Sequence, residues 1–116
     1  MIENIYERSK ILSKTCLKIA LVLPQNTMGN IAKDQLIERL SNLAIKSKGL
    51  LVTQNPEFFL KKLNDAREAV DGCYYWLEIA HDEKWIDIAI IEPVLKECDA
   101  ISKLFGMAIK KIKPNG

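Results

Sequence analysis

The sequence is poor in the residues that most often build active sites. It contains one histidine, His81, and five glycines among 116 residues. A single histidine excludes paired-histidine metal sites, and the chain has no Gly-rich phosphate loop and no Gly-x-Ser-x-Gly elbow. Glu78 and His81 have the Glu-x-x-His spacing of a ferritin-like carboxylate site, but that site needs the motif on two helices and it occurs once here. We therefore expect no metal, no cofactor and no enzymatic activity.

Long hydrophobic runs and closely spaced cysteines are also missing. The longest apolar run, residues 19–23, is far too short to cross a bilayer, and no signal peptide is recognisable. We expect a cytoplasmic protein with no membrane partner. Cys16, Cys73 and Cys98 show neither metal-ligand nor redox spacing, and each lies on an apolar helix face. They are predicted to be buried, reduced thiols that pack as small hydrophobic groups.

A strong net charge is absent, but the charges are unevenly distributed. Seventeen Lys and Arg residues against fifteen Asp and Glu residues leave a net charge of +2. Residues 1–62 contain ten basic and five acidic residues, whereas residues 63–116 contain seven and ten. An electropositive face is therefore compatible with the small total charge.

Helical periodicity is the strongest pattern that the sequence does contain. Between Glu57 and His81, apolar residues recur at alternating steps of four and three, which places them on one face of an α-helix. They are Phe59, Leu63, Ala66, Val70, Cys73, Leu77 and Ala80. Asn55 is predicted to cap this helix, and Pro56 suits its first turn because the missing N–H has no helical partner there.

Three further segments have the same periodicity. The first ends before Pro24, residues 25–30 are predicted to be a loop, and Pro93 implies that the last helix begins near Ile90 or bends there. We predict an all-α, antiparallel up-down-up-down four-helix bundle, one domain of residues 1–116 with helices at about 2–23, 31–51, 56–81 and 87–112. The last helix is apolar on more than one face, which predicts burial in an oligomer.

Several features follow one order along the chain. The first helix closes at Leu23-Pro24, a Glu57-Phe58 pair begins the third, and the small residues after it lead to a Leu77-Glu78-Ile79-Ala80 stretch. This order resembles the four-helix bundle protein family of 23S ribosomal RNA intervening sequences, including the related accessory variability determinant proteins of diversity-generating retroelements. The resemblance implies a homopentameric barrel with a positively charged surface. In the accessory proteins that surface binds nucleic acid and a reverse transcriptase.

Basic side chains supply the candidate nucleic-acid-binding residues. Lys10, Lys14 and Lys18 recur every four residues and form a positive stripe along the first helix. The full candidate set is Arg8, Lys10, Lys14, Lys18, Lys46, Lys48, Lys110, Lys111 and Lys113. The alternative interpretation is an ordinary solvated face, and lysines near helix ends also suit the helix dipole.

Aromatic residues near the end of the third helix supply a second candidate surface. Tyr75, Trp76 and Trp85 have acidic neighbours, which disfavour phosphate, so we expect them to lie at the edge of the core or in a protein interface. Two functions stay open. One is a non-enzymatic, oligomeric nucleic-acid-binding accessory protein, with RNA or DNA and a reverse transcriptase as partners. The alternative is a protein-binding scaffold of the intervening-sequence family with no direct nucleic-acid role.

Overall fold

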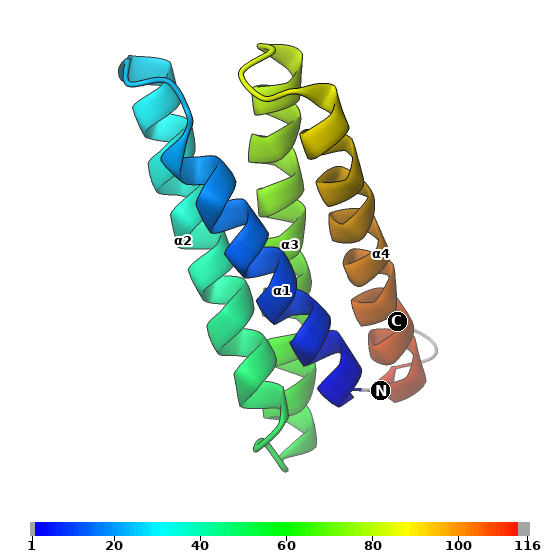
Figure 1. Ribbon diagram of the computed structural model, residues 1–116. Helices are drawn as coiled ribbons and strands as arrows, with labels where there is room; N and C mark the ends of the chain where they lie inside the picture. Colours follow the sequence, from blue (N-terminus) through cyan, green and yellow to red (C-terminus); the bar gives the residue numbers. More distant parts are fainter. Residues whose placement is uncertain (1, 114–116) are drawn as a thin grey trace.

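The described part of the chain folds into four helices that run alternately up and down (Figure 1). A computed structural model describes residues 2–113, with α1 at Ile2–Leu21, α2 at Thr27–Leu50, α3 at Pro56–Asp82 and α4 at Ile88–Ile112. The described residues contain no strand. The prediction of an all-α fold with four helices is confirmed. None of these helices is long and apolar enough to cross a membrane.

Helix α2 begins four residues earlier than predicted, at Thr27. The side-chain oxygen of Asn26 accepts a hydrogen bond from the Gly29 N–H at 2.9 Å. The Asn26 carbonyl accepts another from the Asn30 N–H at 2.8 Å. The prediction of a loop over residues 25–30 was therefore wrong after Asn26, because this cap turns the next four residues into the first turn of the helix.

The starts of α3 and α4 have similar caps. As predicted, Asn55 caps α3, and its side-chain oxygen accepts hydrogen bonds from the N–H groups of Glu57 at 3.0 Å and Phe58 at 3.2 Å. The Asp87 carboxylate accepts a hydrogen bond from the Ala89 N–H at 2.9 Å, so α4 begins at Ile88. Pro93 consequently lies inside α4, where its missing N–H leaves one helical hydrogen bond unmade.

The apolar faces of all four helices meet in one core. On α3, every residue of the predicted apolar face is buried except Phe59, which is half-buried. Phe105 on α4 is the largest fully buried side chain. The core also contains the three serines Ser9, Ser47 and Ser102, and the hydroxyls of Ser9 and Ser47 have no hydrogen-bond partner.

The three cysteines are buried and unpaired by disulfides, as predicted. Helices α1, α3 and α4 bring Cys16, Cys73 and Cys98 into the same part of the core, although the sequence separates them widely. Burial raises the pKa of Cys73, and a hydrogen bond with Cys16 together with burial raises that of Cys98. Neutral thiols are poor nucleophiles, so these residues act as packing groups.

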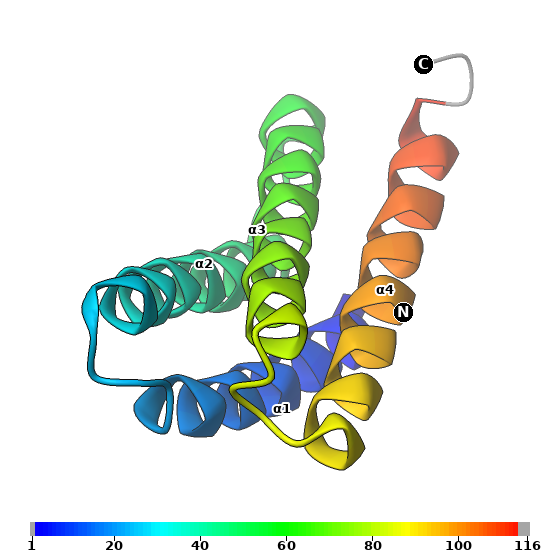
Figure 2. The ribbon, with the colours of Figure 1, turned by 90° about the horizontal axis from the view of Figure 1, so that it is seen from above.

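The helices pack mainly on their neighbours in the chain. Each consecutive pair is in extended contact, and α1 and α4 touch over a shorter length. Within residues 2–113, no Cα atom of α1 lies within 8 Å of one in α3, and none of α2 lies within 8 Å of one in α4. Figure 2 shows that the four helices splay apart rather than run parallel. A bidentate ion pair between Arg8 on α1 and Glu97 on α4 stabilises the α1–α4 contact, which is the smallest of the four.

Candidate functional site

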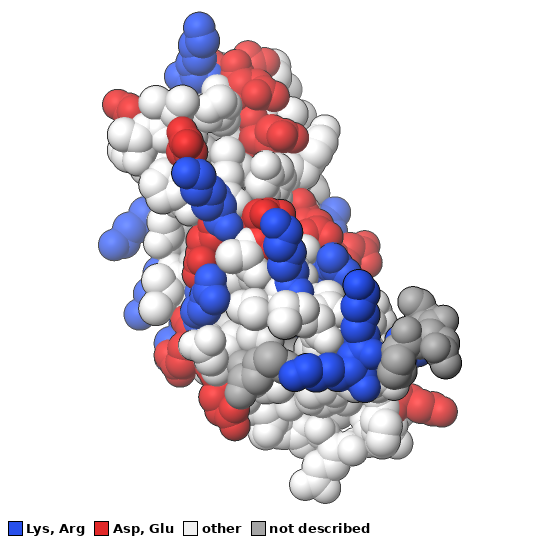
Figure 3. All heavy atoms as spheres, turned by 90° about the vertical axis from the view of Figure 1, so that its right-hand side faces the viewer, with Lys and Arg blue, Asp and Glu red and all other residues white. Residues whose placement is uncertain are grey.

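Lysines from several helix termini gather at one end of the bundle. The antiparallel arrangement places the end of α2, the start of α3 and the end of α4 at the lower end in Figure 1. We call this the basic end, and its members are Lys46, Lys48, Lys61, Lys62, Lys110, Lys111 and Lys113. Figure 3 shows Lys and Arg side chains grouped over the lower half of the α4 face.

Most lysines of the basic end are free to contact a ligand. Lys46 and Lys61 share the carboxylate of Asp65, at 3.6 Å and 3.2 Å. The other five make no ion pair within the described part of the chain. The aliphatic part of Lys62 lies against Gly49, close to the end of α2. The basic end therefore presents an excess of uncompensated positive charge.

Arg8, although a sequence candidate, is held by another helix. Its Nη2 donates to Glu97 Oε1 at 2.7 Å and its Nε to Oε2 at 3.1 Å. The hydrogen bonds that Arg8 donates to Glu97 raise the pKa of Arg8 above its usual value. The guanidinium of Arg8 donates two of its N–H groups to Glu97. It therefore positions α1 against α4 and is less available to bind a phosphate.

The positive stripe on α1 is exposed but does not join the basic end as a unit. Lys10 lies in the half of α1 nearer that end, with its ammonium 5.6 Å from the centre of the Tyr6 ring. Lys18 lies in the last turn, toward the opposite end. The exposed apolar side chains Ile11 and Leu17 lie among these lysines. The stripe is thus more diffuse than the basic end.

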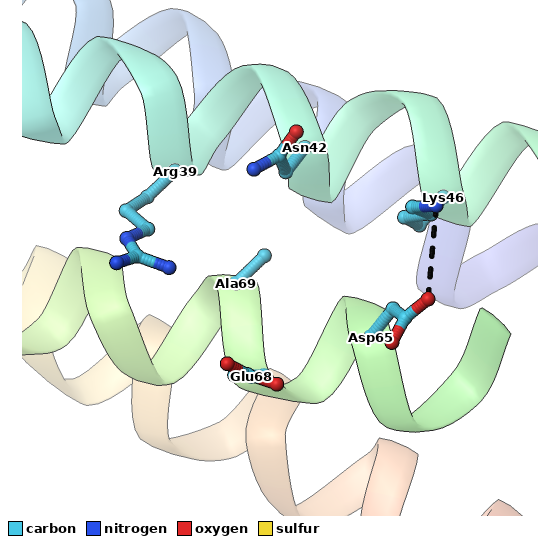
Figure 4. Close-up of a pocket in the computed structure, with 6 residues that line it drawn as sticks. All are labelled: Arg39, Asn42, Lys46, Asp65, Glu68 and Ala69. Carbon is cyan, nitrogen blue, oxygen red and sulfur yellow. Dashed lines mark ion pairs between the residues drawn. The ribbon is translucent and has the colours of Figure 1, made fainter. Parts of the chain in front are cut away.

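A polar groove of about 310 Å³ lies along the contact between α2 and α3 (Figure 4). Arg39, Asn42 and Lys46 face Asp65, Glu68 and Ala69 across it. The Nε atom of Arg39 is buried and has no hydrogen-bond partner. Two cations and two carboxylates balance in this groove, so it attracts phosphate less than the basic end does.

An apolar groove of about 490 Å³ lies between the last turns of α1 and the start of α4. We call it the α1–α4 groove, and it is lined by Thr15, Lys18, Ile19, Val22, Trp85, Ile86, Asp87 and Ile90. Val22 is 67% exposed and Ile90 is 56% exposed. Exposed aliphatic side chains around a half-buried tryptophan are typical of a protein-binding surface.

The three predicted interface aromatics occupy two places. The rings of Tyr75 and Trp76 form an edge-to-face pair with centroids 5.1 Å apart. Tyr75 is exposed, whereas Trp76 is half-buried and packs on the core. Only Trp85 lines the α1–α4 groove. Trp85 is thus the one predicted interface aromatic in the groove. The other apolar lining residues, Ile19, Val22, Ile86 and Ile90, are not predicted from the sequence as interface residues.

Titratable residues do not converge on a metal site. Within residues 2–113, no three His, Cys, Asp or Glu side chains lie close enough to hold a metal ion. The Nδ1 atom of His81 lies 3.7 Å from a carboxylate oxygen of Asp82, at the end of α3. Glu78, His81 and Asp82 do not come close enough together to hold a metal ion.

The structure is similar to a solved protein. A protein of unknown function from the S23 ribosomal protein family of Bacteroides thetaiotaomicron superimposes with a TM-score of 0.83 and 19% sequence identity. The match covers 91% of this chain and 98% of that protein. At this identity the likeness shows a shared fold. No protein-family model matches the sequence, and no curated protein matches it.

Proposed function

We propose that this protein is a non-enzymatic accessory protein that binds the phosphate backbone of RNA or DNA through its basic end. The observation that carries the proposal is the convergence of seven lysines, five of them without an ion pair, from three helix termini. Lysine ammonium groups contact phosphates as point charges and read little sequence. We therefore expect binding with weak sequence preference that falls steeply with salt.

Two triple variants with equal changes in net charge test this proposal. Lys48→Glu, Lys62→Glu and Lys111→Glu together should weaken binding to a labelled structured RNA by about a hundredfold or more at low salt. Lys10→Glu, Lys14→Glu and Lys18→Glu should weaken it by less than about tenfold, since the α1 stripe is only partly at that end. The reverse order of losses would contradict the basic end as the binding surface. Circular dichroism spectra should match that of the wild-type chain for both variants, because the substituted lysines lie on the surface.

We further propose that the protein assembles with itself, and the resemblance drawn from the sequence makes a pentamer the expected assembly. The α1–α4 groove supports this proposal because Val22 and Ile90 expose apolar surface beside Trp85. The same groove also favours the second candidate function, a protein-binding scaffold. A reverse transcriptase is the partner that the resemblance implies, and co-purification would detect it.

Substitutions in the groove test the assembly. Val22→Asp with Ile90→Asp should reduce the particle mass, measured by light scattering, to that of the 13.2 kDa monomer. Both side chains are largely exposed, so folding should be retained. Ile45→Asp is the control because Ile45 is 67% exposed, like Val22, but lies on α2 outside the groove. An oligomer that survives the double substitution would exclude the groove as the subunit contact.

A further inference from the structure

The basic end also carries the most exposed large hydrophobic side chain of the described residues. Val52 is 79% exposed, in the turn between α2 and α3. Leu51, beside it, is 41% exposed, and Phe58 in the first turn of α3 is 61% exposed. None of the three belongs to the core. We call these three residues the α2–α3 tip.

Lysines lie near this tip in the sequence and at the same end of the bundle. Residues 46–62 contain four lysines and a single acidic residue, Glu57. Lys48 lies in the last turn of α2, and the side chain of Lys62 lies against Gly49, two residues before Leu51. The last turn of α4 brings Lys110 and Lys111 to the same end of the bundle. Lys46 and Lys61 share the carboxylate of Asp65, so the unpaired positive charge beside this apolar projection comes from Lys48 and Lys62.

We propose that the α2–α3 tip docks the protein on an anionic membrane surface. Phe58, Leu51 and Val52 enter the boundary between headgroups and acyl chains, and the nearby lysines contact anionic headgroups. Apolar insertion and electrostatic attraction each give weak binding alone and add when they occur at one surface. This mode needs no membrane-spanning helix, so the absence of a long apolar run in the sequence does not bear on it.

A membrane fits this end better than the other candidate occupants do. Phosphate contacts with nucleic acid explain the lysines, and base stacking would occupy Phe58, but neither uses the aliphatic side chains of Leu51 and Val52. Another protein would need a concave surface shaped to the turn, whereas a fluid bilayer accepts a convex tip. The α1–α4 groove and the α2–α3 tip lie at opposite ends of the bundle. Self-assembly through the groove would therefore leave the tip free.

Vesicle co-sedimentation tests the proposal. The full chain should bind phosphatidylcholine vesicles that contain about three parts in ten phosphatidylserine, and should bind pure phosphatidylcholine vesicles far more weakly. Val52→Ser with Phe58→Ser should lower vesicle affinity by at least about tenfold and leave RNA affinity within about twofold. Val52→Trp should raise vesicle affinity, because tryptophan favours the interface.

A control variant and two possible results decide whether the α2–α3 tip binds membranes. Met28→Ser with Ile31→Ser removes two half-exposed apolar side chains at the opposite end of α2 and should leave vesicle binding unchanged. The lysine triple variant of the basic end should lose both vesicles and RNA. Failure of the wild-type chain to bind anionic vesicles would overturn the proposal, as would full binding by the Val52→Ser, Phe58→Ser variant. The parallel RNA titration separates either failure from a failure of nucleic-acid binding.

Discussion

Replacing Phe105 by alanine should lower the free energy of unfolding by about 4 kcal/mol. Phe105 is fully buried and is the largest such side chain in the core. Truncation removes its favourable transfer from water and leaves a cavity that neighbouring helices fill only partly. Urea or guanidinium unfolding followed by circular dichroism measures the loss.

A second phenylalanine provides the matched control. Phe58 lies in the first turn of α3, is 61% exposed and is outside the core. Phe58→Ala should therefore change the free energy of unfolding by less than about 0.5 kcal/mol. Equal losses from the two substitutions would show that α4 does not pack through Phe105. The small effect at Phe58 also allows its use in the vesicle experiment without loss of fold.

The second large effect is expected at Gly29. A Cβ atom there would lie 1.9 Å from the carbonyl oxygen of Pro24 and 2.8 Å from its carbonyl carbon. Both are backbone atoms, so relief requires the α1–α2 connection to move away from the first turn of α2. Gly29→Ala should lower the free energy of unfolding by about 2 to 3 kcal/mol, after an offset of about 1 kcal/mol from better helix propensity. Thermal unfolding should shift down by about 10 °C.

Gly49 is the control for Gly29. It tests whether the loss of stability comes from the close approach of Pro24 or from replacing any helical glycine. A Cβ atom at Gly49 would meet Cδ and Cε of Lys62, each at 3.2 Å, and its Nζ at 4.0 Å. These atoms belong to a flexible side chain that can move aside. Gly49→Ala should leave stability unchanged or raise it by up to about 1 kcal/mol, through helix propensity. Similar destabilisation at both glycines would contradict the steric explanation.

Much of the fold follows from local patterns in the sequence. The apolar face of α3 is evident in the sequence because its residues recur every three or four positions. Asn55 caps α3 through the N–H groups of residues two and three positions later. The sequence places the start of α2 four residues too late because a glycine such as Gly29 is typical of a loop. Its small size instead serves the close approach of Pro24, a contact between two segments. Helix propensity cannot reveal a glycine that is needed for such a contact.

The candidate site was less predictable because it forms between helices. A stripe such as Lys10, Lys14 and Lys18 is visible within one segment. The basic end depends instead on which helix termini lie together, and Lys61 and Lys62 were overlooked for that reason. The sequence alone makes Arg8 a candidate for binding phosphate because its partner, Glu97, is 89 residues away. Side-chain partners at that separation are set by tertiary structure alone.

The Arg8–Glu97 pair has a consequence for the order in which the chain folds. Contacts between consecutive helices close short loops, whereas joining α1 to α4 closes a loop of 89 residues and carries the larger entropic cost. The three helical hairpins can therefore form early, and the α1–α4 contact should form last. It should also be the first contact to open in the native state. Such opening would uncover Cys16 and Cys98, so the rate at which a thiol reagent labels these cysteines reports how often α1 leaves α4.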